Sequence, residues 1–326
     1  MSHEIYPGIY RVEIPIPNNP LKALNSYVIT GGKRPLVIDV GLNREECIEA
    51  MKQGLGELDI DPAQADYCIT HMHADHSGAI GVLADRSAKV YASRIDAQFI
   101  NIMGTSSEHW GRMKEYAIQC GFPEMEADKA IQGHPGFRYG NKNNIDFTTI
   151  GDGAVIRAGD YHFNCIETPG HTQGHICLYE PNRRILISGD HILPGITPNI
   201  STWTDGENPL AAFLKSLEKV AGYEVSLFLP GHRWGNVDCR ARIDQLVKHH
   251  DYRSQDILNI LQHAALTSYQ VAANMRWDLS YTSWEQFPAA QKWFAAGEAA
   301  AHLQFLESKG QIVREISGEG LIQYKL

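Results

Sequence analysis

Three histidines and an aspartate lie within six residues of this chain, in the segment HMHADH at 71–76. His71 and His73 are two residues apart directly after a predicted strand, so a turning backbone lets both rings reach one cation. Asp75 and His76 point in another direction and suit a neighbouring cation. Neutral imidazole and carboxylate groups are good ligands for zinc, iron and manganese, whereas burying them as core filling is costly. The segment therefore predicts a metal site.

Three later segments supply further residues of ligand type. They are TPGHTQGH at 168–175, SGDH at 188–191 and PGH at 230–232. Each puts its ligand-type residue after a predicted strand and beside glycine, which permits a tight turn close to an ion. Because strand ends on a rigid scaffold present functional loops, we expect these segments to converge with HMHADH. The expected metal ligands are His71, His73, Asp75, His76, His171, Asp190 and His232.

The elements that must position these residues are predicted from hydrophobic period and from turn residues. Short runs rich in β-branched or aromatic residues, bounded by Pro, Gly or Asn, predict strands. Helices are predicted at 43–56, near 77–85 and at 208–221, from apolar spacing and capping residues. The predicted strands lie at 9–14, 26–30, 35–40, 65–70, 90–93, 154–157, 161–167, 175–180, 184–189 and 226–230.

Residues 94–147 interrupt this pattern between two of the metal-binding segments. Apolar residues recur at three- and four-residue steps over 94–120 and predict helices. Residues 121–147 are polar, show no clear period and are expected to form a loop. Long loops in compact domains are often functional, so we interpret 94–147 as an insertion that covers the substrate, with a passive surface excursion as the alternative.

The C-terminal part is predicted to be a second, smaller domain. Helical spacing covers 240–263 and 297–309, and Thr267 is a candidate cap for a helix between them. Residues 311–316 and 321–326 alternate apolar and polar positions across SGEG, which indicates a hairpin. Helices followed by a hairpin are typical of a winged helix. We therefore expect a catalytic domain at 1–249 and a winged-helix domain at 250–326.

The order and spacing of the metal motifs resemble the metallo-β-lactamase superfamily, whose signature is HxHxDH followed by a lone His, an Asp and a final His. The resemblance covers roughly residues 5–240. It implies an α/β fold in which two sheets form an αβ/βα sandwich, with two metal ions at one edge. The C-terminal part resembles the small winged-helix module of β-lactamase-like proteins that include an endoribonuclease and thioesterase-type hydrolases.

The resemblance also implies a role for each expected ligand. Asp190 would bridge both ions, and Asp39 in VIDVG would support the site, because carboxylates behind a metal centre orient metal-bound histidines. Other histidines are weaker candidates, namely His109, His134, His175 and His191, while His249, His250, His263 and His302 are expected on helix surfaces. The remaining ligands divide into His71, His73 and His171 for the first metal and Asp75, His76 and His232 for the second.

Two divalent ions about 3.5–4 Å apart polarise a carbonyl or phosphoryl oxygen and acidify a shared water. We therefore expect a metal-bridging hydroxide to attack the substrate, with Asp75 as the catalytic residue that orients it. Zinc is the expected metal, with iron or manganese as alternatives.

The resemblance narrows the reaction class. Flavodiiron oxidoreductases usually carry Glu at the position of His73, and true β-lactamases lack the bridging Asp that Asp190 supplies here. The remaining group is glyoxalase II-like or lactonase-like, so we predict a hydrolase of an ester, thioester or lactone. Two alternatives stay open: an endoribonuclease or phosphodiesterase of the same superfamily, and a catalytically silent regulatory metal-binding protein.

The amino-acid composition and charge indicate which binding partners to expect. The chain has 38 acidic against 29 basic side chains, a formal net charge of -9, whereas proteins that grip phosphates usually carry a basic face. A small-molecule substrate is therefore expected and a nucleic-acid partner is not; a homodimer stays open. No signal-peptide pattern or long apolar run is visible, so we expect a cytoplasmic protein without a membrane partner. The six scattered cysteines predict buried free thiols, with a Cys165–Cys177 disulfide as the alternative.

Overall fold

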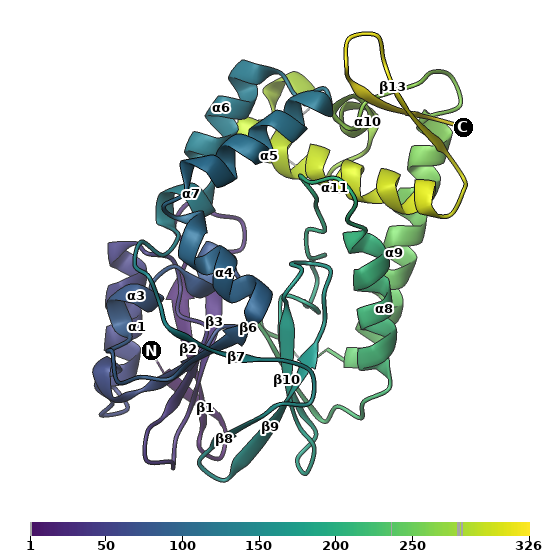
Figure 1. Cartoon of the computed structure of the whole chain (residues 1–326). Coiled ribbons are helices and arrows are strands. Elements are labelled where there is room, and N and C mark those ends of the chain that lie inside the picture. The colour runs from purple at the N-terminus through teal and green to yellow at the C-terminus, as the bar shows by residue number, and fades with distance from the viewer. Residues whose placement is uncertain (1, 236, 279–280, 282) are drawn as a thin grey trace. The chain divides into compact units, whose positions relative to one another are not determined.

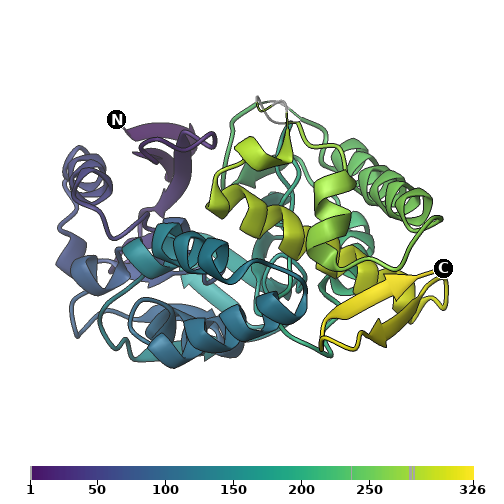
Figure 2. The same ribbon diagram turned by 90° about the horizontal axis from the view of Figure 1, so that it is seen from above.

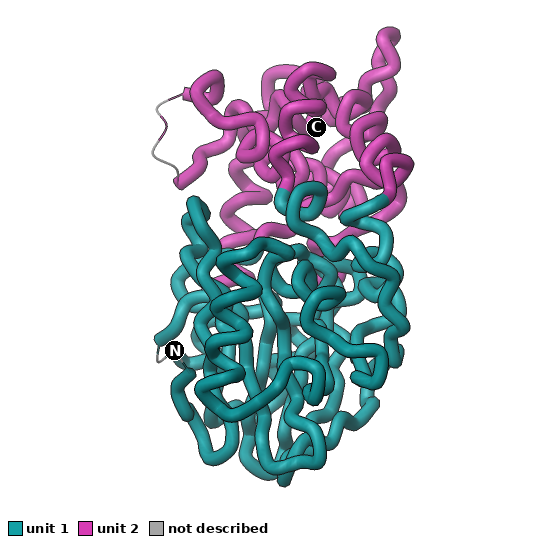
Figure 3. Tube along the Cα trace, turned by 90° about the vertical axis from the view of Figure 1, so that its left-hand side faces the viewer, with its two compact units in different colours: residues 1–105, 135–198, 216–243 teal, residues 106–134, 199–215, 244–326 magenta. Residues whose placement is uncertain are grey.

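The computed structural model describes residues 2–235, 237–278, 281 and 283–326, and these form two compact units (Figure 3). Unit 1 combines residues 1–105, 135–198 and 216–243, and unit 2 combines residues 106–134, 199–215 and 244–326. Both units are therefore assembled from separated segments. The expected boundary between residues 249 and 250 falls inside helix α9 (Cys239–Ile260), and the division into contiguous domains stays a prediction.

The N-terminal strands of unit 1 form, within the described ranges, a seven-stranded sheet whose order follows the chain. Strands β1 to β4 pair antiparallel, and β4 to β7 pair parallel (Figure 1). The carboxyl ends of β4, β5 and β6 therefore lie at the same edge of the sheet. The strands are β1 (Ser2–Tyr6), β2 (Ile9–Pro15), β3 (Ala23–Ile29), β4 (Leu36–Ile38), β5 (Asp66–Cys68), β6 (Val90–Ser93) and β7 (Phe147–Ile150).

The later strands of unit 1 form a second sheet, in the order β12-β11-β10-β9-β8 among the residues described. Strands β8 to β11 pair antiparallel, and β11 pairs parallel with β12. Because β9, β11 and β12 run in the same direction, the segments that follow them leave the sheet at one edge. The strands are β8 (Val155–Ala158), β9 (Tyr161–Glu167), β10 (Ile176–Glu180), β11 (Ile185–Gly189) and β12 (Leu227–Pro230).

The core of unit 1 follows from strand alternation. Leu36 and Ile38 belong to an apolar cluster that also contains Phe163 and Leu178 of the second sheet. Val37, whose side chain points the other way, belongs to a second cluster with residues of the covering helices. Two sheets with helices outside give the expected αβ/βα sandwich. The helices of unit 1 include α1 (Glu45–Gly56), α2 (Ala74–Ser77), α3 (Ile80–Leu83), α4 (Arg94–Met103) and α7 (Pro135–Tyr139).

Unit 2 is mainly helical and ends in the predicted hairpin, which Figure 2 shows in yellow beside the C-terminus. Thr267 caps α10 through a capping box with Gln270, as expected. The helix α11 packs against α6 and α10. These elements are α5 (Ser107–Gln119), α6 (Glu124–Gly133), α10 (Ser268–Asn274), α11 (Ala289–Ser308), β13 (Val313–Ile316) and β14 (Ile322–Lys325), and α8 (Pro209–Ala221) completes the α-helices of the described chain.

Two expectations for the helices need correction. The loop expected over residues 121–147 contains α6 and α7, and the edge strand β7 begins at its last residue. The helix α11 begins at Ala289 rather than near 297, because an alanine-rich helix that is buried on most sides shows no amphipathic period. The six cysteines are all buried and free, as expected, and the alternative Cys165–Cys177 disulfide is absent.

Candidate metal centre

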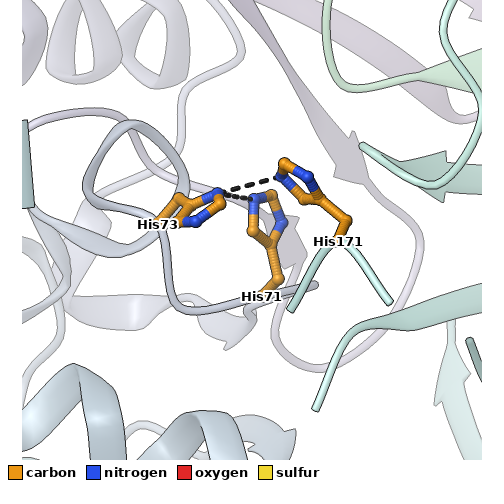
Figure 4. Close-up of side chains that lie close together, drawn as sticks. All are labelled: His71, His73 and His171. Carbon is orange, nitrogen blue, oxygen red and sulfur yellow. Dashed lines mark hydrogen bonds between the residues drawn. The ribbon is translucent and has the colours of Figure 1, made fainter. Parts of the chain in front are cut away.

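Three imidazole rings from two loops of unit 1 converge on one point (Figure 4). His71 and His73 follow β5, and His171 lies in the loop after β9. The Nδ1 atom of His73 lies 3.1 Å from His71 Nε2 and 2.9 Å from His171 Nε2. Because a neutral imidazole carries only one N–H, three nitrogens this close cannot all be satisfied by one another. We call His71, His73 and His171 the three-histidine group.

A second set of donors lies in the same unit. Asp75, His76 and His232 form a group whose ligand atoms lie within 4.8 Å of one another. The two Nε2 atoms of His76 and His232 are 3.1 Å apart, and His232 Nε2 lies 3.3 Å from Asp75 Oδ2. His232 Nδ1 is 2.8 Å from the carbonyl oxygen of Ala23. A carbonyl accepts only, so Nδ1 holds the proton and Nε2 is left as the donor atom for a cation.

Asp190 joins the two groups. Its Oδ2 lies 3.7 Å from His171 Nε2 and 3.5 Å from His232 Nε2, and its Oδ1 lies 3.4 Å from His76 Nε2. The buried Oδ1 makes no well-formed hydrogen bond among the described residues. A buried carboxylate oxygen without a partner is costly, and a cation at this position would remove the cost. The geometry therefore suits Asp190 to the expected bridging role.

Asp39 supports both groups from behind. Its Oδ2 accepts hydrogen bonds from Thr70 Oγ1 at 2.8 Å and from His76 Nδ1 at 2.7 Å, and its Oδ1 accepts one from Thr70 N at 2.8 Å. Thr70 Oγ1 lies in turn 3.1 Å from His71 Nδ1. One carboxylate thus fixes the tautomers of a ligand in each group. Asp39 has a positive φ of 59° directly after β4, which turns its side chain toward the site.

Burial and charge set the protonation of these side chains. Burial lowers the pKa of His73 to about 3, so the ring is neutral and its lone pair is available at pH 7. Burial alone would lower the pKa of His76, but Asp190 and Asp39 outweigh it and raise that pKa. Burial would raise the pKa of Asp75, yet the hydrogen bond with His232 and the charges of the histidines lower it. The three-histidine group thus offers neutral rings, whereas the carboxylates favour a positive charge at His76, a place that a divalent cation would take.

Two glycines of the ligand motifs lie so close to neighbouring side chains that a Cβ atom would not fit. A Cβ atom at Gly231 would lie 2.5 Å from Asp190 Oδ1 and 2.8 Å from His76 Cε1. Gly189 has a φ of 49°, and a Cβ there would lie 2.8 Å from His175 Nε2. A side chain at Gly231 would displace two expected ligands, and one at Gly189 would displace His175 and Thr70, so glycine is required at both positions on steric grounds.

All seven expected ligands belong to unit 1 and are brought together in these groups. Two of the weaker candidates use their rings differently. In His175, Nδ1 lies 2.8 Å from Thr168 Oγ1 and Nε2 accepts from Asp190 N at 3.1 Å. His134 packs its ring against Trp110 and Phe294 in unit 2. The expected surface positions of His250 and His302 are wrong, because these side chains are 1% and 0% exposed.

Comparison with known proteins agrees with this geometry. The model of the metallo-beta-lactamase superfamily matches residues 21–232, and that of the metallo-beta-lactamase-like C-terminal domain matches residues 285–326. The second match does not identify a winged helix, which stays a prediction. No helix in the described part of the chain is long and apolar enough to cross a membrane.

Similar proteins come from several organisms. The chain is 23% identical to the probable metallo-hydrolase YqjP of Bacillus subtilis, over 88% of each chain. It is 25% identical to the human acyl-coenzyme A thioesterase MBLAC2, over 64% of this chain and 72% of that protein. A crystal structure of the metallo-beta-lactamase family protein TTHA1429 from Thermus thermophilus superposes with a TM-score of 0.81 at 25% identity, covering 99% of both chains. The family match, the sandwich and the donor groups agree, and the chain belongs to the metallo-beta-lactamase superfamily.

Proposed function

We propose that this protein is a binuclear metal-dependent hydrolase that cleaves an ester, thioester or lactone. The observation that carries the proposal is Asp190, whose carboxylate lies between the three-histidine group and the group of Asp75, His76 and His232. A donor set shared in this way suits two neighbouring cations better than one.

The proposed role of each residue follows from the two donor groups and from the position of Asp190 between them. His71, His73 and His171 would hold one metal, His76, His232 and Asp75 would hold the other, and Asp190 would contact both. A metal pair in such a site supplies an acidified water and positive charge opposite a developing oxyanion. Asp75, whose pKa is lowered, is ionised at neutral pH and is the group we assign to accept a hydrogen bond from the attacking water. Zinc suits these nitrogen and oxygen donors, with iron or manganese as alternatives.

The thioester is the substrate bond that we test first. The similar human protein carries the name acyl-coenzyme A thioesterase, and thioesters lie within the class expected from the motifs. The nucleic-acid alternative gains little support, because α11 is buried over most of its length and the net charge is -9. The glyoxalase II-like grouping and the cytoplasmic location remain parts of this proposal; six free buried thiols are consistent with a reducing compartment.

A substrate panel tests the proposal. The metal-free protein is reloaded separately with zinc, iron(II) or manganese and assayed on an acyl-coenzyme A, a nitrophenyl ester, a lactone, a nitrophenyl phosphodiester and RNA. We expect metal-dependent turnover of at least one of the first three. The variant Asp190→Asn should be inactive, whereas Asp152→Asn, which changes an exposed carboxylate paired with Lys219, should match the wild type.

The other readings predict different results. Cleavage of only the phosphodiester or RNA would contradict the proposal and show that the protein is a phosphodiesterase or nuclease. Two bound metals without turnover of any substrate would favour the regulatory reading. Turnover that survives Asp190→Asn would contradict the role given to this carboxylate.

A further inference from the structure

The carboxylate of Asp96 is buried in unit 1 and is not a member of the candidate ligand groups. Asp96 is 1% exposed and lies in the first turn of α4, where Ser93 caps the helix by accepting a hydrogen bond from Asp96 N at 3.2 Å. The strand β6 ends at Ser93, at the same edge of the sheet as β4 and β5. The helix start therefore brings the side chain to the edge where the ligand loops lie.

The hydrogen bonds of Asp96 go to two loops that carry metal-ligand candidates. Its Oδ2 accepts from Met72 N at 2.9 Å and from Thr172 Oγ1 at 2.5 Å, and its Oδ1 accepts from Gly174 N at 3.0 Å. Met72 stands between His71 and His73 in the chain, and Thr172 directly follows His171. One carboxylate thus joins the backbones that carry all members of the three-histidine group.

The fit around this carboxylate is close. A Cβ atom at Gly174 would lie 2.6 Å from Asp96 Oδ1 and 2.2 Å from Ser93 Oγ. Burial raises the pKa of Asp96 to about 6, against the effect of its three hydrogen bonds. At neutral pH most of the group is ionised and accepts hydrogen bonds only, which matches the two backbone N–H groups and the hydroxyl that face it.

Asp39 and Asp96 differ in what they hold. Asp39 contacts His76 directly and reaches His71 through Thr70, so it serves both ligand groups. The hydrogen bonds described for the Asp96 carboxylate go to Met72, Thr172 and Gly174, in the loops that carry the three-histidine group. Asp75 and His76 lie further along, on the short helix α2. A loss at Asp96 should therefore affect the two metal positions unequally.

We propose that Asp96 is a positioning residue that holds the two loops of the three-histidine group in register and so sets the affinity of one metal position but not of the other. The inference rests on the proposed binuclear site and adds a residue that the ligand motifs do not contain. It acts through backbone position, since the three-histidine nitrogens converge only when both loops keep their spacing.

The variant Asp96→Asn tests this directly. The amide has the shape of the carboxylate but only one acceptor oxygen. Whichever way it is turned, its NH₂ group faces a backbone N–H, that of Met72 or that of Gly174, and neither can accept a hydrogen bond. We expect Co²⁺ titration of the metal-free protein, followed by visible absorption, to show one equivalent bound as in the wild type and the other about 10- to 100-fold more weakly.

A matched control separates positioning from the general effect of changing a buried carboxylate. Glu180 is 0% exposed, and its Oε2 accepts a hydrogen bond from Arg183 N at 2.7 Å. Its described hydrogen bonds go to Asn182 and Arg183 rather than to a ligand loop. Glu180→Gln should keep both Co²⁺ affinities at their wild-type values.

If Asp96→Asn does not fold, two variants of Thr172 test the same proposal. Thr172→Val removes the hydroxyl that bonds to Asp96 and keeps the side-chain shape, whereas Thr172→Ser keeps the hydroxyl. We expect Thr172→Val to weaken the same Co²⁺ position by a smaller factor and Thr172→Ser to restore it.

The outcomes are distinguishable. If Asp96→Asn, or Thr172→Val in its place, binds both equivalents with wild-type affinity, or loses both equally, the positioning role of Asp96 is wrong while the binuclear site stands. If the wild-type protein itself binds no Co²⁺, the proposed function fails as well.

Discussion

His71 and His171 of the three-histidine group in unit 1 are buried, as is the His250–His302 pair of unit 2, but the ring nitrogens are arranged differently in the two regions. In unit 1, His71, His73 and His171 turn nitrogens toward a common point, with ionised carboxylates nearby. In unit 2, His302 Nδ1 donates to Glu298 O at 3.0 Å, which leaves His302 Nε2 to accept from His250 Nδ1 at 3.2 Å. The two hydrogen bonds are in series: His250 donates to His302, and His302 donates to the backbone carbonyl of Glu298.

Burial of a histidine is therefore not enough to indicate a metal ligand. His250 Nε2 has no hydrogen-bond partner among the described residues, and Phe213 lies against the His250 ring at a centroid distance of 5.4 Å. The pair is therefore a packed, neutral unit. A metal site needs convergent lone pairs and negative charge, and unit 1 supplies both because strand ends bring its loops together.

The sharpest test removes one histidine from each region. His71→Ala should lower metal-dependent hydrolysis on the order of 10³-fold or more, because the proposed centre would lose one of its metal ligands. Metal content per protein, measured by elemental analysis, should fall in parallel. Full turnover with full metal content would remove the basis of the comparison.

The matching change in unit 2 should act on stability instead. His302→Ala leaves a cavity and removes the acceptor of His250 Nδ1, which we expect to cost about 2–4 kcal/mol of unfolding free energy. Urea denaturation measures the cost, with the exposed His263→Ala as the control. Metal content and kcat should stay at wild-type values, and a loss of metal would show that the two regions are not separate in function.

Asp39→Asn sharpens the comparison within unit 1. Asparagine tolerates the positive φ of this position, so the backbone is kept, but its NH₂ group faces a hydrogen-bond donor of Thr70 or His76. We expect the affinity for both metal equivalents to fall by about 10- to 100-fold, as measured by Co²⁺ titration. A loss confined to one equivalent would contradict the shared support that we assign to Asp39.

The last expected effect is a pH dependence of the unfolding free energy in unit 2. Burial lowers the pKa of His250 to about 2 and that of His302 to about 4, whereas an unfolded histidine titrates near pH 6.5. Between about pH 6.5 and 4 the unfolded chain binds protons that the folded pair does not bind. Unfolding free energy should therefore fall as pH falls, by about 1.4 kcal/mol per pH unit for each ring.

The ring of His249 lies 5.2 Å from that of His250, and the ion pair of Arg253 and Glu298 belongs to the same unit. The double variant His250→Phe/His302→Leu isolates the pair. Its unfolding free energy, compared with that of the wild type at pH 7 and pH 5, should fall less on acidification. An equal fall in both proteins would mean that the pair does not titrate as its burial indicates.

Sequence reasoning placed the seven ligand candidates because their spacing follows strand ends, and parallel strands that share an edge bring such positions together. It did not find Asp96. The only local signal was an acidic residue three positions after Ser93, a pattern that also marks an ordinary helix start. Its partners at 72, 172 and 174 are distant in sequence, so only the folded chain shows the contact.

Contacts between distant segments also decide where some helices lie and which of their side chains are buried. The helix α6 lies in a polar stretch, and α11 has an even distribution of apolar residues, so neither presents a clear period. His250 and His302 lie on predicted helices, but which helix face is buried depends on packing against other elements. The spacing of apolar residues indicates the buried face of a helix only when the opposite face is exposed to water.

The types, order and spacing of the seven expected ligands were sufficient to indicate the metallo-beta-lactamase superfamily, which the family match confirms. The folded chain alone shows how the ring nitrogens are oriented, which backbone groups bond to Asp39 and Asp96, and that His250 and His302 are buried. The physical reason is that ligand identity is encoded by single residues, whereas orientation depends on hydrogen bonds between segments far apart in the chain.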